Sequence, residues 1–453
     1  MGQHINAIKD YTSALTIDPA NAFAYYNRGI SYDTNGHLQE AIQDFERASS
    51  LQPQNADFMH NLALCYRKLG RYQEAVSAYG ACLQLCPDHR KALHGRGVCL
   101  EKLHFISEAL QDFRALLALQ PDHTACLISL GQLLLHFYKD DRERLQECTR
   151  LFATALTGLC PSGEYETIVQ GWLLPHITPN DTLPGGGRGI TRHAHTTDNG
   201  DGHSNGRDNK GNRKKTSSVS EGVYRQAIDV LTALYGRARA HCDLGNTNMS
   251  INDLSVCVQL IALFRRCGVD RAAASAMSTA PGLCDVYSTR GLCYKTMGHY
   301  DKAIADYESV ITELQSNSTG TSPASSQGSR SHSTLTDPSR QTLLVETYNF
   351  LGFCLRKMDR YAEAISAYGQ AVRTDPSHIR GYNNRAYCFA KCGSYDEAIA
   401  DYSSVIRLDD RNAHAYHNRG ISLDKMGRFD EAIADFAKVF ACLYLSECVS
   451  IYV

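Results

Sequence analysis

The sequence repeats itself with a period of 34 residues. The aligned segments 22–55, 56–89 and 90–123 share a large apolar or aromatic residue at the fourth position, a small residue at the eighth and alanine at the twentieth. They also share an aromatic residue at the twenty-fourth position and proline at the thirty-second. The frame extends to 345–378, 379–412, 413–446 and the residues from Cys284 onward. A unit this short cannot bury its apolar face alone, so neighbouring units must stack into an array.

The apolar positions within one unit predict two antiparallel helices. The fourth, seventh, eighth and eleventh residues lie on one face of a first helix, helix A. Small residues at the eighth and twentieth positions let helix A approach a second helix, helix B, closely. Proline at the thirty-second position cannot continue a helix and therefore ends helix B. The sequence thus predicts an all-α solenoid of helix-turn-helix units.

These positions resemble the signature of the tetratricopeptide repeat (TPR) family, as Tyr25, Gly29, Ala41, Phe45 and Pro53 illustrate in the first complete unit. The resemblance implies a right-handed superhelix with an inner groove. It also implies the role of TPR proteins generally, which is to bind extended peptides or partner helices.

The repeat frame and the composition divide the chain into segments. We expect an N-terminal TPR array over 1–161 with a truncated first unit, a capping helix over 162–175, a disordered Gly/Asn/Ser-rich linker over 176–222, a degenerate TPR-like region over 223–283, a C-terminal TPR array over 284–446 and a tail over 447–453. A Ser-rich loop over 315–341 interrupts the C-terminal array and is also expected to be disordered, because so polar a segment buries too little apolar surface to offset its ordering entropy. About five extra residues lie around 140–145. Both ends of the chain fall inside a unit, which favours a fragment of a longer protein.

Composition narrows the class of partner and the compartment. Lys and Arg number 46 against 48 Asp and Glu, and this balance argues against nucleic acid as a partner. No apolar run is long enough to span a membrane, and the N-terminus lacks the apolar core of a signal peptide. The 17 cysteines favour a reducing compartment. We therefore expect a cytoplasmic protein without metal, cofactor or small-molecule substrate. A basic run over 210–215 is interpreted as a solvated linker rather than a nuclear import signal.

A second regularity links the seventh and twenty-third positions. Five units carry Arg and Asp there, whereas two units carry Leu62 with Ala78 and Leu351 with Ala367. The joint replacement predicts an ion pair between helices A and B of one unit, in which removal of one partner leaves the other partly buried and unpaired. The predicted pairs are Arg28–Asp44, Arg96–Asp112, Arg290–Asp306, Arg385–Asp401 and Arg419–Asp435.

The sixth position carries asparagine in four units: Asn27, Asn61, Asn384 and Asn418. This position faces the inner groove in TPR superhelices, and the row resembles the asparagine ladder in the peptide-binding groove of O-linked N-acetylglucosamine transferases. An unpaired amide can both donate to and accept from a peptide backbone. The alternative is that each asparagine only caps or solvates helix A. Basic residues at the twelfth and thirteenth positions predict a modest preference for acidic ligands: Arg67, Lys68, Arg356, Lys357, Lys391 and Lys425.

Two functions remain open at the level of sequence. The first is a non-enzymatic protein–protein interaction scaffold. The second is the targeting or regulatory portion of an enzyme whose catalytic domain is missing from this chain. The carboxylate clamp of chaperone-binding TPR proteins is not supported, because only Asn61 and Lys91 match its five positions, where Tyr26, Ile30 and Gly95 stand at the other three. The Tyr-rich and Asn-Arg-Gly-rich repeats resemble long TPR proteins of ciliated and flagellated eukaryotes, which implies ciliary or flagellar association.

Overall fold

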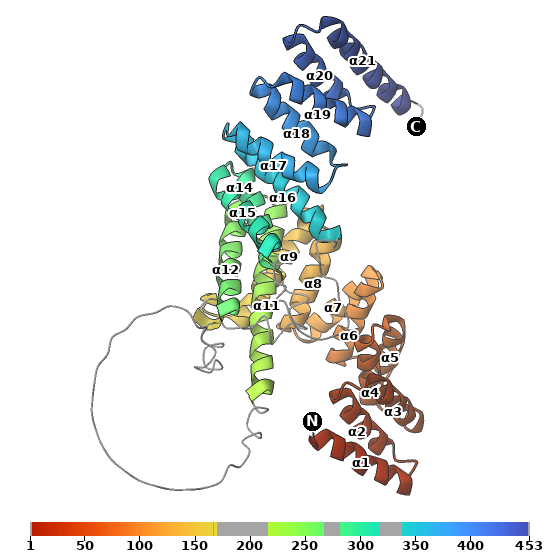
Figure 1. Cartoon of the computed structure of the whole chain (residues 1–453). Coiled ribbons are helices and arrows are strands. Elements are labelled where there is room, and N and C mark those ends of the chain that lie inside the picture. Colours follow the sequence, from red (N-terminus) through yellow and green to blue (C-terminus); the bar gives the residue numbers. More distant parts are fainter. Residues whose placement is uncertain (1, 166, 170–215, 267–280, 317–337, 452–453) are drawn as a thin grey trace, which may run out of the picture. The chain divides into compact units, whose positions relative to one another are not determined.

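The computed structural model describes residues 2–165, 167–169, 216–266, 281–316 and 338–451. Within these ranges the regular secondary structure is helical and no strand occurs. The helices follow one another as antiparallel pairs (Figure 1), so the predicted all-α helix-turn-helix solenoid is confirmed. The chain forms two compact units, Met1–Leu244 and Gly245–Val453.

The first unit consists of a leading helix, four helix pairs and a long helix that packs against the last pair. Its helices are α1 (Gly2–Ile17), α2 (Ala22–Thr34), α3 (Leu38–Leu51), α4 (Ala56–Lys68), α5 (Tyr72–Leu85), α6 (Arg90–Lys102), α7 (Ile106–Leu119), α8 (Thr124–Phe137), α9 (Arg142–Leu159) and α11 (Thr216–Asp243). The even-numbered helices α2 to α8 are A helices, and each is followed by its B helix. Helix α11 contacts both α9 and α8, and buries Leu231, Ala233 and Leu234 completely.

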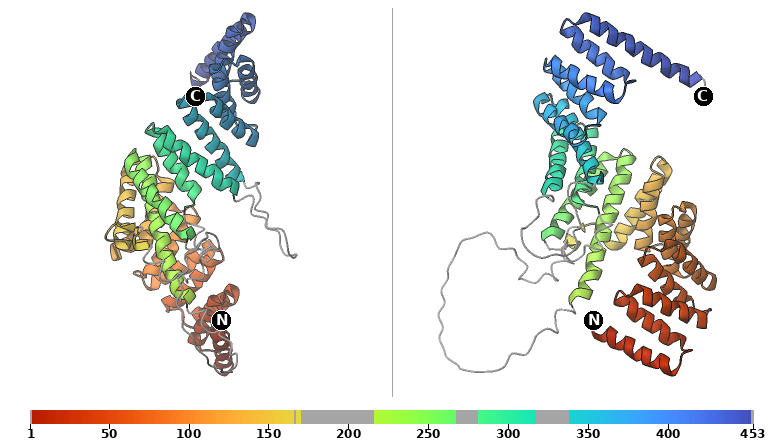
Figure 2. Two further views of the ribbon diagram at one scale, coloured as in Figure 1. Left: turned by 60° about the vertical axis from the view of Figure 1, so that its left-hand side comes forward. Right: turned by 45° about the vertical axis from the view of Figure 1, so that its right-hand side comes forward.

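The second unit begins with one helix and continues with four pairs, which Figure 2 shows from two further sides. Its helices are α12 (Thr247–Arg266), α14 (Leu283–Thr296), α15 (Tyr300–Ser316), α16 (Pro338–Lys357), α17 (Tyr361–Thr374), α18 (Ile379–Lys391), α19 (Tyr395–Leu408), α20 (Ala413–Lys425) and α21 (Phe429–Ile451). Helix α21 continues through most of the segment expected to be a tail.

The small eighth residue of each unit makes the close approach of helices A and B possible. A Cβ atom added to Gly29 would lie 2.9 Å from the Phe45 ring, and one added to Gly352 would lie 2.8 Å from the Tyr368 ring. Phe45 and Tyr368 are almost completely buried, as is Ala41 at the twentieth position. The aromatic residue of helix B therefore fills the space that glycine leaves on helix A.

The fifteenth residue lies in the turn between helices A and B and adopts a positive φ. Glycine occupies this position in most units, for example Gly36 at +82° and Gly70 at +74°. His104 at +62° and Asp359 at +58° adopt the same left-handed conformation without being glycine. That conformation costs about 1–2 kcal/mol for a residue with a side chain.

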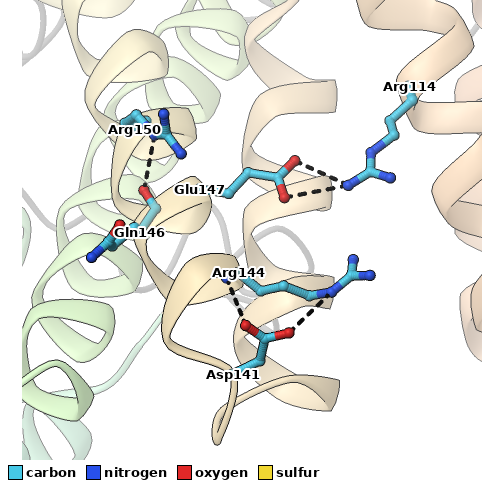
Figure 3. A network of polar contacts seen from close by, with 6 residues as sticks. All are labelled: Arg114, Asp141, Arg144, Gln146, Glu147 and Arg150. Carbon is cyan, nitrogen blue, oxygen red and sulfur yellow. Dashed lines mark hydrogen bonds and ion pairs between the residues drawn. The ribbon is translucent and has the colours of Figure 1, made fainter.

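The extra residues near 140–145 lengthen helix α9. This helix has 18 residues, whereas α3, α5 and α7 have 14 each. The difference corresponds to about one helical turn. Figure 3 shows two contacts that hold the longer helix: Asp141 accepts a hydrogen bond from the backbone N–H group of Arg144 at 3.1 Å, and Arg114 of α7 lies 3.2 Å from the Glu147 carboxylate. The backbone N–H group of Glu143 also donates to Asp141, at 3.0 Å. The frame is then restored, because Phe152 packs on Gly131 in the usual way.

Several sequence expectations fall wholly or partly on residues that the structure does not describe. These are the capping helix 162–175 at residue 166 and from residue 170 on, the linker 176–222 up to residue 215, the basic run 210–215, the degenerate region 223–283 between 267 and 280, the Ser-rich loop 315–341 between 317 and 337, and the tail 447–453 at its last two residues. Helix α11 begins at Thr216 and so includes the last residues assigned to the linker, while Ser316 and Pro338–Gln341 at the edges of the loop belong to α15 and α16.

Candidate functional site

Successive A helices meet through the fifth residue of one unit and the sixth residue of the next. The Asn61 amide donates to the Tyr26 hydroxyl at 2.9 Å, His94 Nε2 bonds with the Ser129 hydroxyl at 3.2 Å, and the Asn384 amide donates to Asn349 Oδ1 at 3.0 Å. Each contact joins residues 35 apart in the sequence. Polar side chains from neighbouring units therefore form a row across the A helices of each array.

The four predicted asparagines lie in this row and are all half-buried. The Asn61 amide donates one hydrogen bond to the Tyr26 hydroxyl and one to the Asp57 backbone carbonyl, and its Oδ1 remains available as an acceptor. The Asn384 amide donates one hydrogen bond, to Asn349 Oδ1. The side chains of Asn27 and Asn418 have no hydrogen-bond partner among the described residues. The row thus combines amides that bridge two units with amides that are free.

A groove of about 800 Å³ follows this row in the N-terminal array. It is lined by side chains of α2, α4, α5 and α6 and by the turns that precede α6 and α8. Its lining residues are Tyr26, Asp57, His60, Asn61, Leu64, Arg67, Tyr79, Asp88, His89, Arg90, Lys91, His94, Gly95 and His123. Gly95 is essential to its shape, because a Cβ atom there would lie 2.4 Å from the Tyr79 ring.

Four histidines form two ring pairs in the groove. His60 and His89 have ring centroids 4.8 Å apart, and His94 and His123 have theirs 5.7 Å apart. His89 and His123 also begin helices, since Nδ1 of each accepts a hydrogen bond from a backbone N–H group of the first turn, at 3.0 and 3.1 Å. The asparagine at the same position of other units, such as Asn21, does the same.

The two inner histidines are neutral at physiological pH. Burial, followed by the proximity of His89 and Lys91, lowers the pKa of His60 from its ordinary value of 6.5 to about 4. Burial, followed by the proximity of His123, likewise lowers the pKa of His94 to about 4. His60 Nδ1 is buried and has no hydrogen-bond partner. The groove therefore contains uncharged imidazoles with unused hydrogen-bonding capacity.

Sequence reasoning did not single out these histidines. The signal was present in the repeat frame, because His60 and His94 occupy the fifth position, one residue before the asparagine row, and His89 and His123 occupy the last position of their units. Within the described ranges, no three His, Cys, Asp or Glu side chains form a group that could hold a metal ion.

The structure pairs each predicted arginine with its aspartate. In all five units Nη2 lies 2.6–2.7 Å from Oδ1, and Nε lies 2.7–2.9 Å from Oδ2, so each contact is bidentate. The aspartate side chains are only 5–8% exposed and the arginines 17–29%. The hydrogen bond that Arg28 donates to the Asp44 carboxylate raises the pKa of Arg28. These arginines are occupied within their own units.

The predicted basic residues at the twelfth and thirteenth positions divide into different environments. Lys68 forms an ion pair with Asp33 of the preceding unit at 2.6 Å. Arg356 lies over the rings of Tyr387 and Phe353, at 4.9 and 5.3 Å from their centroids. Lys357 and Lys391 lie over Phe353 and Tyr387, and Lys425 is exposed. Arg67 alone among the six lines the groove described above.

No described helix combines the length and the apolar character that crossing a membrane requires. The cysteines at the tenth position are packing residues: Cys65, Cys99, Cys354 and Cys388 are at most 1% exposed. Burial raises the pKa of Cys65 to about 12 and that of the other three to about 11. These thiols are therefore protonated and inert.

Comparison with known proteins adds family matches in both units. Family models described as tetratricopeptide repeat match residues 26–90, 285–313, 345–378 and 412–443, and a model described as TPR repeat matches 386–427. Comparison with curated proteins gave no match.

Similar solved structures include a TPR protein from Parabacteroides merdae, with 14% identity, a TM-score of 0.38, and coverage of 89% of this chain and 98% of that one. MamA has 17% identity, a TM-score of 0.33, and coverage of 46% and 96%. YrrB, described as a TPR protein with an unusual peptide-binding site, has 15% identity, a TM-score of 0.34, and coverage of 49% and 91%. With family matches in both units and helix pairs that repeat every 34 residues, the chain belongs to the tetratricopeptide repeat family.

Proposed function

We propose that this protein is a non-enzymatic scaffold that binds extended peptides or partner helices along the A helices of its two arrays. The polar row formed by the fifth and sixth residues supports the proposal most directly. It runs from unit to unit, it lines a groove in the N-terminal array, and its groups retain hydrogen-bonding capacity.

The remaining capacity suits a peptide backbone. Asn27 and Asn418 offer complete amides, Asn61 offers Oδ1, and Asn384 offers Oδ1 and one N–H group. A backbone in extended form presents alternating N–H and C=O groups, which such amides bind without reading side chains. Each hydrogen bond gained contributes about 0.5–1.5 kcal/mol.

The test begins with selection of binders from a display library of short random peptides on the full chain. Selected peptides are then measured against two double variants, Asn27→Ala with Asn61→Ala and Asn384→Ala with Asn418→Ala. Loss of one pair is expected to weaken the peptides of that array by about tenfold. Gln43→Ala and Gln370→Ala serve as controls, because both glutamines are exposed on B helices of the same arrays.

Circular dichroism must show that the variants remain folded. If the selected peptides bind both asparagine variants as tightly as they bind the wild type, the row is not the binding surface and the proposal fails.

A further inference from the structure

Arg67 differs from the five arginines at the seventh position of the A helices. The five arginines at the seventh position each form a bidentate pair with an aspartate. Arg67 is half-buried in the groove, and its guanidinium forms neither an ion pair nor a hydrogen bond with any described residue. No nitrogen of the Arg67 guanidinium is among the buried side-chain atoms that lack a hydrogen-bond partner, so its five donors are accessible to a ligand.

The equivalent residue of the C-terminal array shows what is missing around Arg67. Arg356 also stands at the twelfth position, and it lies over aromatic residues at the ninth position of its own unit and of the next. In the N-terminal array these two positions hold Leu64 and Val98. Neither side chain provides a π-face, so Arg67 lacks the cation–π contacts that Arg356 makes.

The walls around Arg67 favour an incoming negative group. Arg90 and Lys91 also line the groove, against the two carboxylates of Asp57 and Asp88. The Asp57 side chain is 71% exposed and Asp88 is exposed as well, so both carboxylates are largely solvated. Asn61, Tyr79 and the neutral imidazoles of His60 and His94 add polar groups without charge to the lining. Arg67 is therefore the one charged residue of the groove lining that is half-buried, since Arg90 and Lys91 are exposed as well.

We propose that Arg67 receives the carboxylate of an aspartate or glutamate side chain from an extended peptide in the N-terminal groove. The proposal rests on the proposed function, since the peptide is the ligand of the same groove. A guanidinium binds a carboxylate through two parallel hydrogen bonds, which gives both affinity and orientation. The N-terminal array would thus select acidic peptides, and the C-terminal array, where Arg356 lies over two aromatic rings and its Nε is buried, would not.

The test uses the full chain and positional-scanning libraries of short peptides with acetylated and amidated ends, in which Asp, Glu, Asn or Gln is fixed at successive positions. Fluorescence polarisation should show that the acidic pools bind about tenfold more tightly than their amide counterparts at one position. Arg67→Gln should abolish this difference while the amide pools keep their affinity. Arg67→Lys should retain part of the difference, because it keeps the charge and loses the paired hydrogen bonds.

Arg356→Gln is the matched control and should leave the preference unchanged. Equal affinity of acidic and amide pools for the wild type, with binding still lost in the Asn27/Asn61 variant, overturns the role of Arg67 and leaves the proposed function standing. Binding only of pools with a free C-terminus overturns it as well, because the carboxylate would then belong to the chain end. Failure of every pool to bind contradicts both proposals. An equal weakening of acidic and amide pools by Arg67→Gln, or a lowered melting temperature in that variant, assigns Arg67 a structural role.

Discussion

At the scale of single residues, the molecule depends on groups whose partners come from the same or the next unit. In the bidentate Arg–Asp pairs, the aspartate is almost completely buried and the arginine is largely buried, so each charge depends on the other for compensation. The corresponding Leu351 and Ala367 are 7% and 6% exposed, so the apolar combination fills the same place. Buried ion pairs and well-packed apolar residues of similar volume often have comparable stability, whereas half of a pair is costly.

Arg385→Leu is expected to destabilise the C-terminal array by roughly 3 kcal/mol, because Asp401 remains buried without its partner. The double variant Arg385→Leu with Asp401→Ala should recover much of this loss, since it reproduces the Leu351 and Ala367 combination. Urea unfolding of the four chains of a double-mutant cycle measures the coupling. Additive effects of the two substitutions would show that the pair contributes no coupling energy.

Stability should also depend on pH through His60 and His94. The folded chain keeps both imidazoles neutral down to about pH 4, whereas the unfolded chain takes up protons near the ordinary pKa of 6.5. Stability is therefore expected to fall as the pH falls through this window. The variant His60→Gln with His94→Gln should show a flatter dependence in urea unfolding at a series of pH values. An unchanged slope in the variant would assign the dependence to other groups.

At the scale of helices, the period predicted the A and B helices and the Arg–Asp pairs well, because both depend on contacts within one unit. Contacts between residues that are far apart in the sequence could not be predicted from the 34-residue period. The packing of α11 on α8 and α9, for example, joins residues on either side of 170–215. The histidine pairs were also missed, because the frame gives positions and not the rotamers that bring rings together.

The contact of α11 can be tested with a matched pair of glycines. Alanine is preferred over glycine in a helix by about 1 kcal/mol. A Cβ atom at Gly236 would lie 2.4 Å from the Phe152 ring, whereas one at Gly80 in the middle of α5 meets nothing within 4 Å. Gly236→Ala should therefore lower the melting temperature and Gly80→Ala should raise it. A rise in both variants would show that α11 does not pack tightly on Phe152.

At the scale of the whole molecule, each helix pair contacts mainly its neighbours in sequence. The free energy of unfolding of such an array is approximately the sum of the intrinsic stability of each unit and the interaction energy between adjacent units. A destabilising substitution in one unit therefore affects mainly that unit and its neighbours. The two compact units, each with its own stacked pairs, extend this argument to the full chain.

Hydrogen exchange followed by mass spectrometry can measure this locality. In the Arg385→Leu chain, exchange should accelerate in α18, α19 and the adjoining helices, while α2 to α7 keep the protection of the wild type. The double variant with Asp401→Ala should restore slow exchange in the same helices. Faster exchange throughout both units would mean that the chain unfolds as one cooperative body.

If residues are substituted one at a time, a unit that replaces its Arg–Asp pair with Leu and Ala must first carry one of the two substitutions without the other. That intermediate is less stable than either end, so stepwise substitution meets a barrier that selection resists. Copying a block of units avoids the barrier, because both residues travel together. The order Arg, Leu, Arg occurs over 22–123 and again over the units that contain Arg290, Leu351 and Arg385, which is the pattern that copying of a block would produce.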